Sequence, residues 1–410
     1  MQVELPFGRE RLRVELPDAA RILQPNLARP LPNPLQAVRL RLDTPQAGPP
    51  LQDRLRPGQS VAIVISDITR PAPNKTLLPP ILDTLHAAGI EDDAITIVNG
   101  TGLHRVNTPA ELEEMLGAAI VARYRIVQHT AFDASTLVEV GRSRGVPVEL
   151  CRTYVEADVR IVTGFVEPHL FAGYSGGAKG VMPGVAGAMI VMSNHGAANL
   201  SHPRAHFLAT AGNPVFEEMQ AIVAMCPPHF LLNVTLDPEH RITGVFTGDW
   251  RETHAAAVEQ AEHQYIVPIA RPYDVVVTTN MGYPADTTLY QAVKGMSVAA
   301  EGVREGGAIV LVAGCEEGLG GEEYVRQLTS GASPAALLDQ IGAAEHPRHD
   351  QWQIQCQTIV QAKADVYLHS RLTRAETESA HLRYSEDVSQ TVRELVAEAQ
   401  AQGRDGSVLV

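Results

Sequence analysis

Short apolar runs alternate with segments of helical periodicity along most of this chain. Continuous apolar runs bounded by polar residues or glycine are typical of strands that are buried on both faces of a sheet. Such runs predict strands at residues 61–65, 94–98, 124–128, 146–150, 159–163, 274–278, 308–313, 364–369 and 408–410. The segments between them predict helices at residues 74–88, 109–116, 287–300 and 385–401, and a mostly helical link at 320–367. This alternation indicates an α/β fold with largely parallel sheets flanked by helices.

The chain is too long for one ordinary hydrophobic core, because it has 410 residues. A proline-bounded segment at 268–272 precedes a new series of strands and helices, so we place a boundary there. We therefore expect two domains, residues 1–268 and 271–393, and a tail, 394–410, which could pack back on the first domain. We expect the active site in the cleft between the domains. The first 55 residues or so, rich in proline, predict short β structure.

Composition narrows the class of protein. The chain carries 47 acidic and 33 basic residues, a net charge of −14, which disfavours nucleic acid and anionic membranes as partners. No apolar run approaches the roughly 20 residues of a membrane span, and the amino terminus lacks the features of an export signal. Four scattered cysteines without a CxxC motif indicate free thiols in a reducing cytoplasm.

Polar clusters follow several of the predicted strands. They occupy residues 67–71, 99–105, 167–184 and 280–284, each just after a strand. Ligands of open α/β sheets bind beyond the carboxyl ends of the strands, so these clusters are the candidate site. The third of them is the most unusual, because it holds five glycines around His169 and Lys179, and His195 follows soon after. A lysine in such a setting is either a phosphate contact or a point of covalent attachment.

Two common nucleotide-binding motifs are disfavoured by the residues at one or two of their positions. Arg105 stands where a GxGxxG fingerprint beginning at Gly100 would need its third glycine. A Walker phosphate loop around Lys179 would need glycine at 178 and a hydroxyl residue at 180, but Ala178 and Gly180 occupy these positions. The backbone there could still hold one phosphate.

Other side chains of the clusters suit acid–base and anion chemistry. His104 follows a glycine turn at a strand end, a good place for proton transfer. Arg70 could bind a carboxylate through both of its terminal nitrogens. Lys294 lies three residues after Gln291, so the two share a face of their predicted helix. A capping or surface role stays open for each.

Taken together, the clusters resemble the nickel-pincer lactate racemase family, in which 2-hydroxy acids are racemised. The resemblance spans residues 66–355 and rests on separate motifs in one order. These are Asp67-Ile68-Thr69-Arg70-Pro71, Gly100-Thr101-Gly102-Leu103-His104-Arg105, Pro168-His169 through Lys179, Ser193-Asn194-His195-Gly196, Tyr290-Gln291-Ala292-Val293-Lys294 and His349-Asp350-Gln351-Trp352. One departure is Ile68, where the lactate enzymes would have histidine, and it bears on the identity of the substrate.

The resemblance implies a nickel-bearing cofactor, the pyridinium-3,5-bisthiocarboxylic acid mononucleotide, covalently attached at Lys179. It implies His195 as the nickel ligand and His104 and His169 as acid–base groups, one for each face of the substrate. Further implied contacts are to the cofactor (Thr69, Gly176, Gly177) and to the substrate (Asp67, Arg70, Tyr290, Gln291, Lys294, Trp352).

The implied reaction is a racemisation through transient hydride transfer and a 2-keto acid. Two histidines serve such a reaction because each enantiomer needs a base on its own face. A short aliphatic acid such as lactate is the favoured substrate, and cofactor-maturation enzymes are expected partners, with a homo-oligomer left open. A nicotinamide-dependent 2-hydroxy-acid dehydrogenase and a non-catalytic small-anion binding protein are the alternatives.

Overall fold

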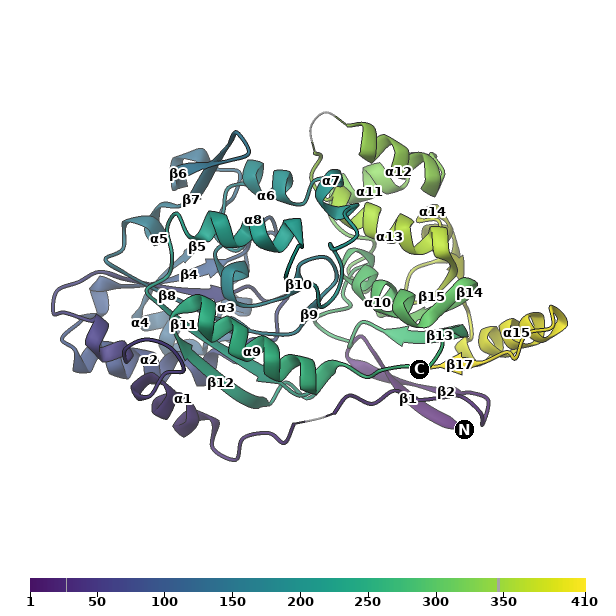
Figure 1. The fold of residues 1–410 in the computed structure, drawn as a ribbon, viewed down its shortest axis with the longest axis horizontal. Coiled ribbons are helices and arrows are strands. Elements are labelled where there is room, and N and C mark those ends of the chain that lie inside the picture. Colours follow the sequence, from purple (N-terminus) through teal and green to yellow (C-terminus); the bar gives the residue numbers. More distant parts are fainter. Residues whose placement is uncertain (27, 345–346) are drawn as a thin grey trace. The chain divides into compact units, whose positions relative to one another are not determined.

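The chain folds into two compact units, each described here by itself (Figure 1). The computed structural model describes residues 1–26, 28–344 and 347–410. The N-terminal unit comprises Pro25–His195 and Ser201–Ile266, and the C-terminal unit comprises Met1–Gln24, Gly196–Leu200 and Val267–Val410. In the described part of the chain, no helix has both the length and the apolar character that a membrane span requires.

The N-terminal unit is built on a twisted sheet with the strand order β12-β11-β8-β3-β4-β5. Every neighbouring pair is parallel except β11 with β12, which is antiparallel. The strands are β3 (Val61–Ser66), β4 (Ile95–Gly100), β5 (Arg125–Gln128), β8 (Val159–Phe165), β11 (Phe230–Leu236) and β12 (Ile242–Gly248). Residues of β3, β4 and β8 are almost all buried, as their continuous apolar runs predict.

Helices and two small hairpins surround this sheet (Figure 1). The helices are α1 (Pro34–Asp43), α2 (Asn74–Ala87), α3 (Pro109–Leu116), α4 (Ala118–Arg123), α5 (Arg152–Glu156), α6 (Ala188–Asn194), α8 (Pro214–Val223) and α9 (Trp250–Tyr265). The hairpins are β6 (Leu137–Ser143) with β7 (Val146–Cys151), and β9 (Pro168–His169) with β10 (Gly173–Tyr174). The predicted strand at 146–150 therefore exists, but it pairs with β6 and lies outside the parallel sheet.

The C-terminal unit has a parallel sheet of its own, with the order β16-β15-β14-β13-β17. The strands are β13 (Tyr273–Thr279), β14 (Val303–Val312), β15 (Ala364–His369), β16 (Arg383–Tyr384) and β17 (Val408–Leu409). The helices are α7 (Ala197–Leu200), α10 (Leu289–Gly302), α11 (Glu322–Leu328), α12 (Pro334–Ala343), α13 (Gln351–Lys363), α14 (Arg374–Ser379) and α15 (Val388–Ala401). The expected α/β class with parallel sheets is thus confirmed.

The predicted domain limits differ from these units at both ends of the chain. Residues 1–24 fold with the C-terminal unit, and β1 (Gln2–Phe7) and β2 (Glu10–Glu15) form a hairpin there. The reason is the alternation of side chains along β13. Val276 faces the core beneath α10, whereas Val275 and Val277 face a second core that the hairpin and α15 cover.

The tail 394–410 also belongs to the C-terminal unit. It completes α15 and then adds β17 beside β13, where Val408 and Leu409 are buried. Strand β17 in turn holds the chain near Arg21, because Arg21 and Leu409 form a parallel bridge. Both chain ends are therefore parts of one core.

The amino-terminal region contains a helix that the sequence did not predict. Helix α1 replaces the expected β structure at 34–43, because Asn33 caps it and Pro34 stands in its first turn. The Asn33 side chain accepts a hydrogen bond from the N–H of Gln36. The β structure expected for the first 55 residues is therefore wrong at residues 34–43, where Asn33 and Pro34 mark the start of a helix.

Candidate active site

The polar clusters of the N-terminal unit lie at one edge of its sheet. Strands β8, β3, β4 and β5 are neighbours and parallel, so the loops that follow them emerge side by side. These loops and the adjoining turns carry a set of predicted site residues: Asp67, Thr69, Arg70, His104, His169, Gly176, Gly177, Lys179 and His195. The sequence predicted a site at the carboxyl ends of these strands, and the strand order brings the loops at those ends together.

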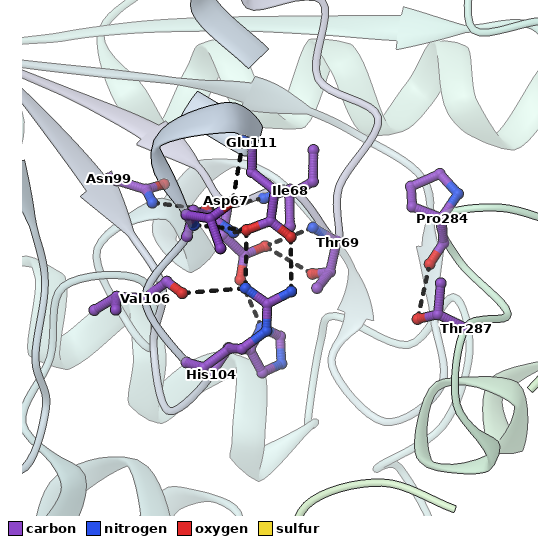
Figure 2. Close-up of polar contacts among 12 residues, drawn as sticks. Asp67, Ile68, Thr69, Asn99, His104, Val106, Glu111, Pro284 and Thr287 are labelled. Carbon is purple, nitrogen blue, oxygen red and sulfur yellow. Dashed lines mark hydrogen bonds and ion pairs between the residues drawn. The ribbon is translucent and has the colours of Figure 1, made fainter. Parts of the chain in front are cut away.

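Asp67 and His104 form a hydrogen-bonded pair across the ends of β3 and β4 (Figure 2). The distance from Nδ1 of His104 to Oδ2 of Asp67 is 2.6 Å. A carboxylate only accepts hydrogen bonds, so Nδ1 of the neutral imidazole carries the proton and Nε2 is left without one. This tautomer makes His104 a ready acceptor of a proton at Nε2.

The other oxygen of Asp67 is held by Thr69. Oδ1 accepts hydrogen bonds from the hydroxyl of Thr69 at 2.7 Å and from its N–H at 3.2 Å. Burial acts to raise the pKa of Asp67, but His104, Thr69 and Arg70 outweigh it, so the pKa of this carboxyl lies below its ordinary value. Asp67 was predicted to touch substrate and Thr69 to touch cofactor. Both of these contacts stay predictions, and the hydrogen bonds within the protein also make Asp67 and Thr69 positioning residues for His104.

A polar network fixes the loop that carries His104 (Figure 2). Glu111, in the first turn of α3, accepts two hydrogen bonds from the Arg105 guanidinium, at 2.7 and 2.8 Å. Asn107 lies beneath the loop, where Asn99 donates to it at 2.8 Å and it donates to Glu111 at 3.2 Å. Arg105 holds the pKa of Glu111 down to about 2, with burial opposing it and the contacts of Thr108 and Asn107 adding to the effect. The loop thus keeps its anchoring anion at any moderate pH.

Phe171 is the centre of the glycine-rich turn. Its ring lies edge-on to His169, with a centroid distance of 4.8 Å, and edge-on to His195, at 4.9 Å. The ammonium nitrogen of Lys179 lies 5.9 Å from the centre of the same ring. One buried aromatic side chain therefore gathers the predicted acid–base group, the predicted metal ligand and the predicted attachment lysine.

Lys179 and Arg70 are two neighbouring cations at this edge. Burial lowers the pKa of Lys179 to about 7, and the positive charge of Arg70 acts in the same direction. Within the described residues, neither side chain has a hydrogen bond to an acceptor or an ion pair with a carboxylate. At neutral pH a large share of Lys179 is therefore an uncharged amine, which is the nucleophilic form.

His195 is a buried imidazole at the carboxyl end of α6, with 5% of its surface exposed. Burial lowers its pKa to about 3 and Lys179 adds to the shift, against an opposing contact with the backbone of Val191. Neutral imidazole is a suitable ligand for nickel. Across residues 1–26, 28–344 and 347–410, no three His, Cys, Asp or Glu side chains are grouped to hold a metal. A metal bound at His195 would therefore need further ligands from a cofactor.

The glycines of this turn are required by contacts within the protein. Gly176 and Gly177 both have positive φ angles, 72° and 51°. A Cβ atom on Gly177 would lie 2.5 Å from the ring of His254, and one on Gly176 would lie 2.7 Å from Oδ1 of Asn233. His254, in α9, also donates from Nε2 to the carbonyl of Ser175 at 2.9 Å. The predicted cofactor contacts of these glycines stay a prediction, and the packing under the turn already explains their identity.

We expect Gly177→Ala to destabilise the N-terminal unit and to disturb the turn before Lys179. The cost should be about 2–4 kcal/mol, from overpacking against His254 and from the left-handed backbone. Thermal or urea unfolding measures it. The double variant Gly177→Ala/His254→Ala should recover part of the loss, since the steric term is removed and the backbone term is not. If the loss of stability in the double variant equalled the sum of the losses in the two single variants, Gly177 and His254 would not be coupled and this account of the turn would be wrong.

In the C-terminal unit, helix α10 presents Gln291 and Lys294 together. Nζ of Lys294 donates to Oε1 of Gln291 at 2.5 Å, as their spacing on one helix face predicts. Asn280, just after β13, donates to the carbonyl of Gln291 at 3.1 Å and so ties the strand end to the helix. The amide N–H₂ of Gln291 makes no hydrogen bond to any of the described residues, which leaves it as a donor for an anionic ligand.

Tyr290 and Trp352 form a second bonded pair in this unit. The indole N–H of Trp352 donates to the hydroxyl of Tyr290 at 3.0 Å, and only 5% of the Trp352 surface is exposed. Burial raises the pKa of Tyr290 well above its ordinary value, and Asp350 adds to the effect. The two predicted substrate residues are therefore brought together, with their polar groups directed at each other. That they and the N-terminal set face one cleft stays a prediction.

Some residues of the site were missed by the sequence analysis. Phe171 was within the quoted turn, but nothing in its spacing showed that three functional side chains would surround it. His254 lies in a helix far along the chain, so only the fold brings it under the turn. Ile68, the departure from the expected motif, packs partly buried against the core beneath the sheet. An apolar side chain is therefore suited to that position.

Comparisons with known proteins agree with the resemblance. The family model of the lactate racemase N-terminal domain matches residues 7–207, and that of the lactate racemase C-terminal domain matches residues 269–410. The lactate racemase of Thermoanaerobacterium thermosaccharolyticum is 30% identical over 404 residues, which is 97% of this chain and 93% of that protein. The lactate racemase of Lactiplantibacillus plantarum is 35% identical over 325 residues, 78% of this chain and 76% of that protein.

Solved structures give the same result for the fold. The lactate racemase apoprotein from Thermoanaerobacterium thermosaccharolyticum superimposes with a TM-score of 0.90 at 28% identity, covering 100% of this chain and 98% of that one. A protein from Thermotoga maritima shares the fold, with a TM-score of 0.69 at 18% identity and coverage of 92% and 96%.

Fold and site together define a two-unit α/β protein with a partly buried lysine and histidines at the carboxyl ends of a parallel sheet. The chain belongs to the lactate racemase family.

Proposed function

We propose that this protein is an isomerase that racemises a 2-hydroxy acid, with lactate as the reference substrate. One observation carries the proposal: His169, Lys179 and His195 surround Phe171 at the sheet edge that also carries the Asp67–His104 pair. A racemase needs proton-transferring groups for two opposite faces, and His104 and His169 supply two imidazoles. The names of its relatives support the same activity.

The residues present fit the cofactor that the family resemblance implies. Lys179, with its pKa near 7, suits covalent attachment of a carboxyl-derived arm, and neutral His195 suits a nickel ion. Thr69, Gly176 and Gly177 are the further proposed contacts of this group. When bound, the nickel–pyridinium mononucleotide supplies an acceptor for the hydride of the substrate.

The acid–base work falls to His104 and His169. His104, held by Asp67 in the tautomer with the proton on Nδ1, takes the hydroxyl proton of one enantiomer at Nε2. His169 is the proposed acid–base group for the other enantiomer. The N–H of Ala172 donates to its Nδ1 at 3.3 Å, so the neutral ring carries its proton on Nε2 and must release this contact before it takes up a further proton. In a racemising turnover one imidazole takes the hydroxyl proton, and the other, in its protonated form, donates a proton to the oxygen when the planar 2-keto acid is reduced again. No net proton is consumed, and the two imidazoles exchange their protonation states.

The substrate carboxylate is the proposed ligand of Arg70, Gln291 and Lys294. Each offers N–H donors, and Arg70 and Lys294 add positive charge. Tyr290 and Trp352 are further proposed contacts of the substrate. We further propose a cytoplasmic enzyme that receives its cofactor from maturation enzymes. The free state of all four cysteines agrees with a reducing compartment.

A chiral assay tests the function directly. Protein co-expressed with cofactor-maturation enzymes should convert either enantiomer of lactate to the racemate without added NAD. His169→Gln should lower kcat by about 10²–10⁴-fold, because one face loses its base. Accumulation of the 2-keto acid only when NAD is added would favour a dehydrogenase instead.

A further inference from the structure

A hollow of about 380 Å³ opens between the loops that follow β4 and β5. We call it the β4–β5 hollow. Its wall is mainly apolar, formed by Leu103 and Val106 from one loop and by Ala131 and Phe132 from the other, and His104 is part of the same wall. Phe132 and Val106 are 64% and 45% exposed, so the rim carries apolar surface that reaches solvent. All of these residues belong to the N-terminal unit.

The β4–β5 hollow lies next to the candidate active site. Strands β4 and β5 are parallel neighbours, and the hollow lies at their carboxyl ends, the edge where ligands of such sheets bind. It adjoins the imidazole that Asp67 orients. A group bound to His104 through its hydroxyl could therefore extend an apolar part into the hollow without a change of fold.

The charge of the wall selects against an anionic occupant. The lining, all of it within the described residues, contains no lysine or arginine. His129 adds no charge, because its Nε2–H donates to the carbonyl of Ala186 at 2.9 Å and burial lowers its pKa. Asp133 contributes a carboxylate, whose pKa is lowered by hydrogen bonds from the hydroxyl and N–H of Ser135. A second carboxylate, as in a dicarboxylic hydroxy acid, would be repelled here.

Size selects against a methyl group. A water molecule, which is close to a methyl group in size, takes about 30 Å³ in the liquid. The hollow is several times larger, so the side chain of lactate would leave most of it to solvent. An aliphatic chain or an aromatic ring would cover the apolar side chains of the wall. Removal of this apolar surface from water would add to the binding free energy of the substrate.

We propose that the β4–β5 hollow binds the side chain of the substrate and that the preferred substrate is a 2-hydroxy acid with a larger apolar side chain, branched aliphatic or aromatic. This inference rests on the proposed function and names its substrate class. It replaces the short aliphatic acid that the sequence favoured. Trp352 is buried and bonded to Tyr290, and its size alone does not limit the substrate.

The test compares kcat/KM across lactate, 2-hydroxybutyrate, 2-hydroxy-4-methylpentanoate, 3-phenyllactate and malate in the cofactor-loaded enzyme. We expect kcat/KM to rise along the apolar acids, mainly through KM, by up to about fourfold for each methylene buried. Malate should be the poorest substrate. Phe132→Ala, which removes one wall, and Val106→Phe, which fills the hollow, should each lower the ratio of phenyllactate to lactate kcat/KM by about tenfold.

Two controls separate the subsite from general damage. Leu40→Ala removes an apolar side chain of similar exposure, 57%, from helix α1, and should leave the ratio unchanged. Binding of 3-phenyllactate to the apoprotein, measured by calorimetry, should weaken in Phe132→Ala and not in Leu40→Ala. Racemisation of lactate with a ratio that Phe132→Ala and Val106→Phe do not change would overturn the subsite alone. Absence of racemisation for every acid of the panel would overturn the proposed function, and the subsite with it.

Discussion

Lys179→Ala should abolish racemisation and remove the covalent cofactor. Tethering and the reaction depend on the same amine, so we expect activity to fall by more than about 10³-fold, to the level of an enzyme without its cofactor. Intact mass spectrometry of protein co-expressed with maturation enzymes should show the adduct on the peptide of Lys179 in the parent chain and no adduct in the variant. Lys179→Arg should behave like Lys179→Ala, because guanidinium keeps the charge and is not a nucleophile.

Lys75→Ala is the matched control, since it removes an exposed lysine from helix α2 of the same unit. It should keep both the adduct and the activity. An adduct that persists in Lys179→Ala would show that the attachment lies elsewhere. Activity that persists without any adduct would contradict the covalent role of this lysine and favour a reversibly bound cofactor.

We expect Lys179 to lower the unfolding free energy of the apoprotein, although activity depends on it. Its pKa is lowered from 10.5 to about 7, so the unfolded chain binds a proton between these values while the folded chain does not. The unfolding free energy of the parent should therefore rise with pH across this window. Lys179→Met should be more stable by about 1–3 kcal/mol at pH 7, where a partly buried charge is replaced by an apolar side chain. The gain should disappear near pH 10.5.

The sequence predicted the strands that carry the site, and the polar clusters after them, because both signals are local in the chain. Buried parallel strands read as continuous apolar runs, and β3, β4 and β8 lie where those runs lie. The clusters that hold Asp67, His104 and Lys179 directly follow these strands. The sequence is enough to place each cluster after a strand. Only the strand order of the folded sheet shows that the clusters are neighbours in space.

The contacts within the site could not be predicted, because they depend on pairings between distant segments. The Asp67–His104 bond crosses 37 positions of the chain, and His254 lies 79 positions from the carbonyl that it holds. The hairpin of residues 2–15 packs against one face of the C-terminal sheet, although that sheet comes from the last 140 residues or so of the chain. The apolar surface that it covers includes side chains that alternate along β13, such as Val275 and Val277. Periodicity indicates which side chains are buried, but not against which part of the chain.

Asp67→Asn should separate orientation from acid–base chemistry. The carboxylate accepts the Nδ1 proton of His104 over 2.6 Å, and this fixes Nε2 as the proton acceptor. An asparagine amide can present its own N–H₂ to Nδ1, which stabilises the opposite tautomer and places the proton on Nε2. We expect kcat to fall by about 10²–10⁴-fold with little change in KM, the pattern of a base held in the wrong tautomer.

Asp92→Asn provides the matched control within the same unit. Asp92 pairs with Nε2 of His86 at 2.8 Å, but it precedes β4, whereas Asp67 follows β3, so the two pairs lie at opposite edges of a parallel sheet. Asp92→Asn should leave kcat unchanged. Asp67→Glu should recover part of the lost rate, because it restores a carboxylate acceptor. If Asp67→Asn raised KM for lactate and left kcat unchanged, Asp67 would be a substrate contact, as the sequence first suggested, and His104 would owe its orientation to the loop alone.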